Sequence, residues 1–373
     1  MENVTQGYQD PILQKVLSAY DFPETLLGAV RYGQGHINDT YCVVCQPQEG
    51  DPVRFILQGM SRAAFPHPEE LMENFIGITS YLRKKIIAAG GDPARETLSL
   101  VKTKDGRDFY TDENGKVWRL TPFIENTDCF QSATPELFEA SARAFGRFQY
   151  LLQDYPAETL HETIVNFHNT EDRFAKFEAA LAADKRNRAK DVEQEIQFVL
   201  HRKADCSVAL AALREGKLPL RVTHNDTKLN NILIDRATHE GICVIDLDTT
   251  MPGLSINDFG DSIRFGANHS KEDEKDLGKV NFDIDLFEAY TRGFLEGAQG
   301  SLTEGELEYL PWGARLMTLE CGIRFLTDYL EGDHYFRIHY PEQNLDRART
   351  QFKLVSDMEA QFDRMAAVVA KYA

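Results

Sequence analysis

The hydrophobic pattern of this 373-residue chain changes once, near Pro122-Phe123-Ile124. From Leu26 to that point, short β-branched and aromatic runs alternate with turn-forming residues, which predicts an antiparallel sheet of about five strands. After it, apolar residues recur mainly at helical spacing. A chain of this length exceeds what one hydrophobic core usually serves. We therefore expect an α+β protein with one domain over residues 1–124 and a mainly helical domain over residues 125–373.

Helical spacing appears once inside the strand-like part, from about Pro68 to Ala89. In the second part, Thr134-Pro135 supplies an N-cap and a proline at the first helical position. Further helices are expected at about residues 171–183, 191–214, 283–297, 304–331 and 341–371, and a short β-rich segment at residues 221–248.

The net charge of the chain indicates which kinds of partner it can bind. The chain carries 59 acidic against 41 basic side chains, a net charge of −18, which repels nucleic acid and anionic membrane surfaces. The start of the chain lacks a basic run followed by an apolar core, and no apolar stretch approaches the ~20 residues of a membrane span. We expect a cytoplasmic protein with a small diffusible substrate. Six cysteines are too few for a disulfide scaffold, and Cys42 and Cys45 are interpreted as structural.

The segment that indicates chemistry reads His224-Asn225-Asp226-Thr227-Lys228-Leu229-Asn230-Asn231. It fits H-x-D-x-x-x-x-N, the catalytic loop of kinases. In such a loop Asp226 would accept the proton of the attacking hydroxyl, and Asn231 would offer an amide oxygen to Mg²⁺. Lys228 stands where it could offset charge on the transferred phosphate. For an isolated His-x-Asp, turn capping and a solvated lysine would be the simpler interpretation.

A second acidic element follows at the expected distance. Residues 241–248 form an apolar run that ends in Asp246 and Asp248. Kinases place a second Mg²⁺ ligand in this way, at a strand end just after the catalytic loop. We predict Asp246 as that ligand. Because Asp246 and Asp248 alternate with Leu247, both side chains are expected on one side of the strand.

The triplet Asp258-Phe259-Gly260 spells the D-F-G sequence of protein kinases but comes too late after Asp226. It opens a predicted helix through Arg264 rather than ending a strand. We therefore interpret Asp258 as a helix N-cap, and Asp261 as structural too.

Near the start of the sheet, a loop that includes Gly33, Gly35 and His36 joins two predicted strands. Glycines there let backbone N–H groups approach phosphates, so this loop is predicted to cover the nucleotide. The alternative is an ordinary hairpin turn. Phe123, at the predicted hinge, is a further candidate nucleotide contact.

Together these residues resemble the aminoglycoside phosphotransferase and choline kinase superfamily, and within it the bacterial N-acetylhexosamine 1-kinases. The likeness is densest from His224 to Ala267, including Val244-Ile245-Asp246-Leu247-Asp248-Thr249 and Met251-Pro252-Gly253-Leu254. It implies a protein-kinase-like two-lobe fold, with ATP and Mg²⁺ required. It also implies that the substrate is a sugar whose C1 hydroxyl attacks the γ-phosphate.

The resemblance also implies a sugar site late in the chain, with roles for Arg324 and Tyr335. An alternative stays open, because Glu320, Arg324 and Asp328 have i, i+4 spacing and could form an ion ladder on a helix surface.

One position departs from the kinase pattern. The third strand carries Gln58 where a kinase normally has the lysine that contacts ATP phosphates, and Gln58 is itself a candidate nucleotide contact. The missing charge could come from Lys228, from Arg62 or from a second Mg²⁺, and Glu73 is the candidate helix partner of that position. Two other functions compete: a kinase of the same fold for an aminoglycoside or choline, and a non-catalytic pseudokinase.

Overall fold

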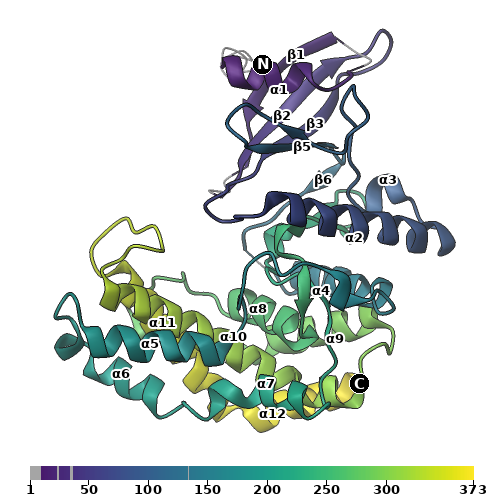
Figure 1. Ribbon diagram of the computed structural model, residues 1–373. Coiled ribbons are helices and arrows are strands. Elements are labelled where there is room, and N and C mark those ends of the chain that lie inside the picture. Colours follow the sequence, from purple (N-terminus) through teal and green to yellow (C-terminus); the bar gives the residue numbers. More distant parts are fainter. Residues whose placement is uncertain (1–9, 23–24, 34–36, 133) are drawn as a thin grey trace. The chain divides into compact units, whose positions relative to one another are not determined.

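A computed structural model describes residues 10–22, 25–132 apart from 34–36, and 134–373. The chain forms two compact units (Figure 1). The first unit contains Met1–Thr127 and also a short later segment, Leu160–Ile164; the second contains Asp128–Thr159 and Val165–Ala373.

The first unit is built on a five-stranded antiparallel sheet with the order β1-β2-β3-β5-β4. This confirms the sheet that the turn pattern predicted. Its strands are β1 (Thr25–Arg31), β2 (Asp39–Gln46), β3 (Val53–Gly59), β4 (Tyr110–Thr111) and β5 (Val117–Pro122), and β6 (Thr127–Asp128) follows at the boundary of the unit. Cys42 and Cys45 are buried in β2, and neither forms a disulfide.

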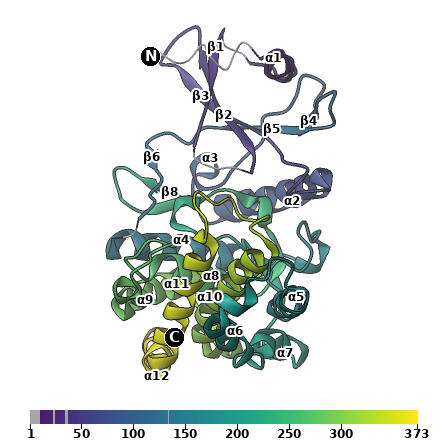
Figure 2. The same cartoon turned by 90° about the vertical axis from the view of Figure 1, so that its left-hand side faces the viewer.

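Helix α2 (Pro68–Ala88) is the helix expected inside the strand-like part. Its buried face includes Leu71, Phe75, Ile78 and Leu82, at spacings of three and four. A short helix, α3 (Pro93–Glu96), follows it. Helix α1 (Pro11–Ser18) was not expected from the sequence, because its eight residues give little periodicity; it begins where the side chain of Asp10 accepts a hydrogen bond from Ile12 N. Its buried residues pack against those of the sheet. Figure 2 shows the helix beside the sheet.

The second unit is mainly helical, as predicted. Helix α4 starts after Thr134, whose side chain caps Leu137 N. Its Gly146 packs so close to α9 that a Cβ there would stand 2.1 Å from Phe294 O. The helices of this unit are α4 (Pro135–Leu151), α5 (Thr170–Ala183), α6 (Glu193–Leu200), α7 (Val208–Arg214), α8 (Ser255–Gly266), α9 (Ile284–Ala298), α10 (Glu304–Glu331), α11 (Gln343–Ala360) and α12 (Phe362–Tyr372).

Two of the expected helices are each divided in two. The stretch 191–214 breaks between α6 and α7, where Arg202 pairs with Glu359 and Asp205 with Arg315. These ion pairs reach α11 and α10, so tertiary contacts rather than glycine or proline hold the turn. The stretch 341–371 breaks at Gln361, between α11 and α12.

Four short strands complete the second unit and frame the predicted catalytic segment. β7 (Arg221–Thr223) pairs antiparallel with β10 (Met251–Gly253), and β8 (Ile232–Asp235) pairs antiparallel with β9 (Gly241–Val244). Across the described ranges, none of the helices combines the length and apolar character that crossing a membrane requires.

Candidate active site

Residues 224–231 form a loop between β7 and β8. The backbone turns at Asn225, whose φ is 64°, a left-handed conformation that asparagine tolerates better than most residues. The amide nitrogen of Asn225 donates to the carbonyls of Thr223 and Thr249 at 3.1 and 2.9 Å. These bonds fix the direction in which the chain enters Asp226.

The side chain of Asp226 lies between a cation and an amide. Lys228 Nζ is 2.6 Å from Asp226 Oδ1. Asn231 Nδ2 donates to Asp226 O at 2.8 Å and to Asp226 Oδ2 at 3.3 Å. Burial by itself would lower the pKa of Lys228, but the carboxylates of Asp226 and Asp261 outweigh it and raise that pKa, so the ammonium stays charged. The structure therefore brings Asp226, Lys228 and Asn231 together, as the loop motif led us to expect.

The buried side chain of His224 holds the loop in place. Its side chain is fully buried, with Phe145 and Phe148 packed edge-on at 5.6 and 6.1 Å between ring centroids. Nε2 lies 2.8 Å from the carbonyl oxygen of Ile245 and so must carry a proton, and Nδ1 accepts from Asp226 N at 3.2 Å. His224 thus connects Asp226 to the end of β9.

Asp258 holds the same loop, and the interpretation of it as a helix N-cap is wrong. Helix α8 begins at Ser255, after Leu254, so Asp258 lies inside the helix. Its carboxylate accepts from His224 N at 2.9 Å, Asn225 N at 2.7 Å and Gln149 Nε2 at 2.7 Å. One buried side chain thereby satisfies two backbone N–H groups of the loop, which local sequence spacing could not reveal.

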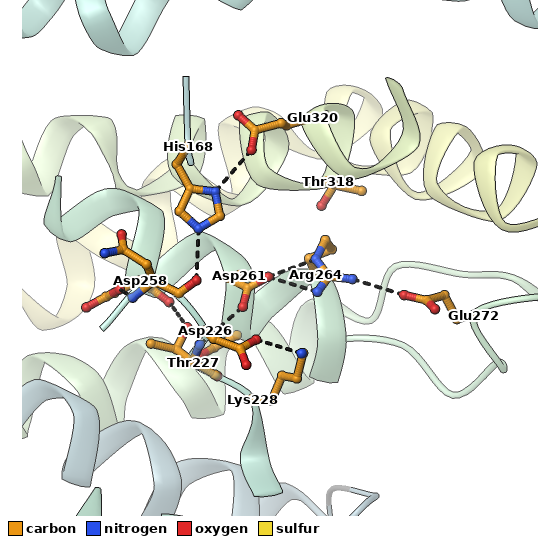
Figure 3. A network of polar contacts seen from close by, with 12 residues as sticks. His168, Asp226, Thr227, Lys228, Asp258, Asp261, Arg264, Glu272, Thr318 and Glu320 are labelled. Carbon is orange, nitrogen blue, oxygen red and sulfur yellow. Dashed lines mark hydrogen bonds and ion pairs between the residues drawn. The ribbon is translucent and has the colours of Figure 1, made fainter. Parts of the chain in front are cut away.

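One turn further along α8, Asp261 and Ser262 hold Thr227. Figure 3 shows Asp261 beside Thr227. Asp261 Oδ2 accepts from Thr227 N at 3.2 Å, and Ser262 Oγ donates to Thr227 O at 2.5 Å. Arg264 Nε donates to Asp261 at 2.9 Å. Burial would raise the pKa of Asp261, but the charges of Arg264 and Lys228 lower it, so the carboxylate stays ionised. The expected structural role of Asp261 is to support the loop.

Asp246 and Asp248 do not share one side of a strand, which corrects the expectation from their alternation. β9 ends at Val244, Asp246 has a φ of 60°, and Leu247–Thr249 form a single 3₁₀ turn. Because the extended backbone stops before Asp246, the period of two no longer applies. Asp246 is exposed and Asp248 is 2% exposed.

His168 connects helix α10 to the loop of residues 224–231, and no sequence signal pointed to it. Its Nδ1 lies 3.0 Å from Glu320 Oε1, and its Nε2 lies 2.9 Å from Asn225 O (Figure 3). A carboxylate and a carbonyl only accept hydrogen bonds, so both ring nitrogens donate and the ring is an imidazolium. Burial alone would lower the pKa of His168, but the bond to Glu320 outweighs it and raises that pKa. Glu320 also accepts from Thr170 Oγ1 at 2.8 Å.

The ion ladder on α10 is not formed. Glu320 bonds His168 and Thr170, and the carboxylate of Asp328 accepts from the backbone N–H groups of residues 334, 335 and 336. Within the described ranges Arg324 has no ion pair. Its guanidinium lies 5.7 and 5.2 Å from the ring centroids of Tyr335 and Phe336, and the Tyr335 side chain is 71% exposed. The two residues predicted for the sugar site therefore lie side by side.

A second guanidinium, that of Arg173 on α5, lies near that of Arg324. Burial lowers the pKa of Arg173, and the positive charge of Arg324 lowers it further. Arg173 Nη2 donates to Phe167 O at 2.8 Å. Sequence spacing gave no indication of this residue.

The predicted nucleotide contacts belong to the first unit. Gly33 has a φ of 76°, a conformation that favours glycine, whereas Gly35 and His36 lie outside the described residues. Phe123 lies below the guanidinium of Arg54, 3.8 Å from the ring centroid. Gln58, on β3, accepts two hydrogen bonds from Arg119.

Arg62 was considered as a source of the charge missing at position 58, and Glu73 as the helix partner of that position. Both bond other residues. Glu73 bonds His161 Nε2 at 2.7 Å, and Arg62 donates to Gly115 O at 2.7 Å and pairs with Glu69 at 3.2 Å.

Solved structures with this fold include three kinases or phosphotransferases. The microcompartment-associated aminopropanol kinase is 18% identical, with 95% of this chain and 98% of that chain covered and a TM-score of 0.57. An aminoglycoside phosphotransferase from Alicyclobacillus acidocaldarius is 16% identical, with 98% and 96% covered and a TM-score of 0.58. An amicoumacin kinase in complex with AMP-PNP and Ca²⁺ is 15% identical, with 97% and 93% covered and a TM-score of 0.57. At these identities the likeness establishes the kinase-like fold.

The family model described as "Phosphotransferase enzyme family" matches residues 29–297, which is more than half of the chain and includes the whole loop of residues 224–231. On this match the chain belongs to the phosphotransferase enzyme family.

Proposed function

We propose that the protein is an ATP- and Mg²⁺-dependent kinase that phosphorylates the C1 hydroxyl of an N-acetylhexosamine. The observation that carries the kinase assignment is the arrangement of Asp226, with Lys228 Nζ at 2.6 Å and Asn231 Nδ2 at 3.3 Å from its carboxylate. Membership of the phosphotransferase family supports it.

In this proposal Asp226 orients the C1 hydroxyl and accepts its proton as the sugar oxygen attacks the γ-phosphorus of ATP. The new O–P bond forms while the bond from the γ-phosphorus to the bridging oxygen breaks, and ADP leaves with that electron pair. Lys228 stays charged because its pKa is raised, so it offsets charge on the phosphoryl group.

The residues proposed for Mg²⁺ have suitable chemistry. The amide nitrogen of Asn231 donates to Asp226, so the amide oxygen remains available to a metal. Asp246 offers an exposed carboxylate. Oxygen donors of this kind suit Mg²⁺, which usually takes the rest of its shell from phosphate and water. A bound Mg²⁺ would neutralise charge on the phosphates. The described ranges contain no cluster of three or more His, Cys, Asp or Glu side chains able to hold a metal. The complex of the amicoumacin kinase with AMP-PNP and Ca²⁺ supports the use of a nucleotide and a divalent cation.

The charges near Arg324 favour a neutral sugar over a cationic alcohol. Arg324, Arg173 and His168 are cationic, and the neighbouring carboxylate of Glu320 already bonds His168 and Thr170. A choline or aminoglycoside site needs acidic groups or an open aromatic cage. Here the rings of Tyr335 and Phe336 face the guanidinium of Arg324. Hydroxyl and acetamido oxygens of a sugar would instead accept hydrogen bonds from that group.

The test is a panel of acceptors, with GlcNAc, GalNAc, choline, an aminopropanol and an aminoglycoside each assayed with ATP and Mg²⁺. We expect turnover of an N-acetylhexosamine, with the phosphate assigned to C1 by NMR. Turnover of a cationic alcohol alone would replace the sugar assignment with the second kinase function. Binding of nucleotide without any turnover would indicate the pseudokinase.

Arg324→Ala tests the substrate assignment separately. We expect the KM for the sugar to rise strongly and the KM for ATP to stay within a small factor, because this guanidinium is proposed to bond only the acceptor. The matched control is Arg337→Ala, which removes an exposed arginine of the same segment. An unchanged sugar KM in Arg324→Ala would remove this residue from the site.

A further inference from the structure

Gln58 stands where kinases carry the lysine that contacts nucleotide phosphates, yet a cation lies directly beside it. In the sheet register Gln58 on β3 pairs with Arg119 on β5, so both side chains are on one face of the sheet. Arg119 Nε and Nη2 donate to Gln58 Oε1 at 3.1 and 2.8 Å. The sequence alone could not reveal this pair, because the two residues are 61 positions apart.

The pair has a fixed orientation. Two guanidinium donors converge on one amide atom of Gln58, and only the oxygen can accept both, so the NH₂ group must point the other way. Its nearest described partner is Thr40 Oγ1 at 3.5 Å, at the outer limit of a hydrogen bond. The amide of Gln58 thus presents its donors on the side away from the cation.

Arg119 and Gln58 differ in how far they are buried. Arg119 is 1% exposed, and its guanidinium lies 4.5 Å from the ring centroid of Phe75 on α2. Gln58 is half-buried and is therefore the member of the pair that a ligand can reach. An arginine keeps its charge when buried, and its field is stronger there than in water. Arg119 polarises the amide of Gln58 and strengthens its N–H donors.

Three other basic side chains of the first unit already have partners. Arg62 bonds Gly115 O and Glu69, and Lys116 and Arg31 both pair with Asp39.

We propose that the amide of Gln58, backed by the buried charge of Arg119, binds a phosphate group of the nucleotide in place of the usual lysine. The proposal rests on the proposed function, since it takes the ligand to be ATP. Gln58 is the binding residue and Arg119 is a positioning residue. A neutral donor backed by a buried cation provides a positive potential without a flexible, titratable side chain.

Gln58→Glu tests this pairing, because the change replaces NH₂ by a negatively charged oxygen at almost constant shape. The new carboxylate can pair with Arg119, so we expect an unchanged or higher melting temperature. It also cancels the positive potential and repels phosphate, so we expect the affinity for Mg²⁺ with AMP-PNP to fall about tenfold or more. Affinity for adenosine, which has no phosphate, should change less than about twofold.

The measurement is isothermal titration calorimetry on the full chain, with Gln48→Glu as the matched control because it makes the same chemical change at an exposed residue of this unit. Equal loss in Gln58→Glu and Gln48→Glu, or none in Gln58→Glu, would overturn the proposal while the kinase assignment stands. A wild-type protein that binds no nucleotide would instead overturn the proposed function. If Gln58→Glu does not fold, Gln58→Met decides the same question, because it removes the amide donors and should weaken AMP-PNP binding but not adenosine binding.

Discussion

Asp226 is the residue on which the proposed chemistry depends most directly. Asp226→Asn keeps the shape of the side chain but removes its ability to accept a proton, so we expect turnover to fall by roughly 10²- to 10⁴-fold, the usual contribution of a positioned general base. AMP-PNP affinity and melting temperature should stay near those of the wild type. Asp363→Asn, at an exposed carboxylate of the same unit, is the control. Near-normal turnover in purified Asp226→Asn would exclude this residue as the base.

At the scale of elements, helix α8 supports the loop of residues 224–231 through Asp258. The carboxylate of Asp258 accepts hydrogen bonds from the backbone N–H groups of His224 and Asn225. An asparagine at this position could accept from only one of them. We expect Asp258→Asn to lower stability by about 1–3 kcal/mol and to lower kcat as well, because the loop loses its anchor. Asp246→Ala should remove Mg²⁺-dependent turnover with a smaller loss of stability than Asp258→Asn, because Asp246 is exposed and Asp258 is buried. Interchanged effects, seen by calorimetry and by an assay over a range of Mg²⁺ concentrations, would move the metal site to Asp258.

The His168–Glu320 pair links α10 to the same loop and predicts a pH dependence. The folded pKa of His168 is raised, so the imidazolium stabilises the fold fully below the unfolded value of about 6.5. That stability is lost as the pH rises through the raised pKa. His168→Gln should therefore be less stable than the wild type near pH 6, with a gap that narrows on the alkaline side. Thermal unfolding between about pH 6 and 9 checks this, with exposed His201→Gln as control. A gap independent of pH would show that the ring acts only by packing.

At the scale of the whole molecule, the chain returns to the first unit after it has begun the second. Residues Leu160–Ile164 belong to the first unit, where buried Asn74 bonds both backbone groups of His161 at 2.8 Å. Asn74→Ala leaves those two groups without these partners, so we expect a loss of about 1–3 kcal/mol and faster proteolysis near His161. Exposed Gln48→Ala should change neither quantity. Unchanged stability and cleavage in Asn74→Ala would mean that the returning segment does not need this side chain.

The sequence by itself determined the features that depend on neighbouring residues. Alternating apolar runs with turn residues predicted the five-stranded sheet, and the 3.6-residue period with an N-cap at Thr134 predicted helix α4. Asp226, Lys228 and Asn231 lie within one short loop, so their spacing alone was enough to bring them together.

Only the tertiary structure decided which distant side chains complete these local pieces. Asp258 holds a loop more than 30 positions away, His168 bonds a carbonyl 57 positions away, and Arg119 meets Gln58 across two strands. The local pattern around Asp258 predicted a helix N-cap, and the spacing around Arg324 allowed an ion ladder. Both interpretations failed because the buried carboxylates of Asp258, Glu320 and Asp328 bond donors from other segments of the chain. Local conformation follows from short-range sterics and periodicity. The partner of a buried polar group is set by the three-dimensional packing of elements that are remote in the sequence.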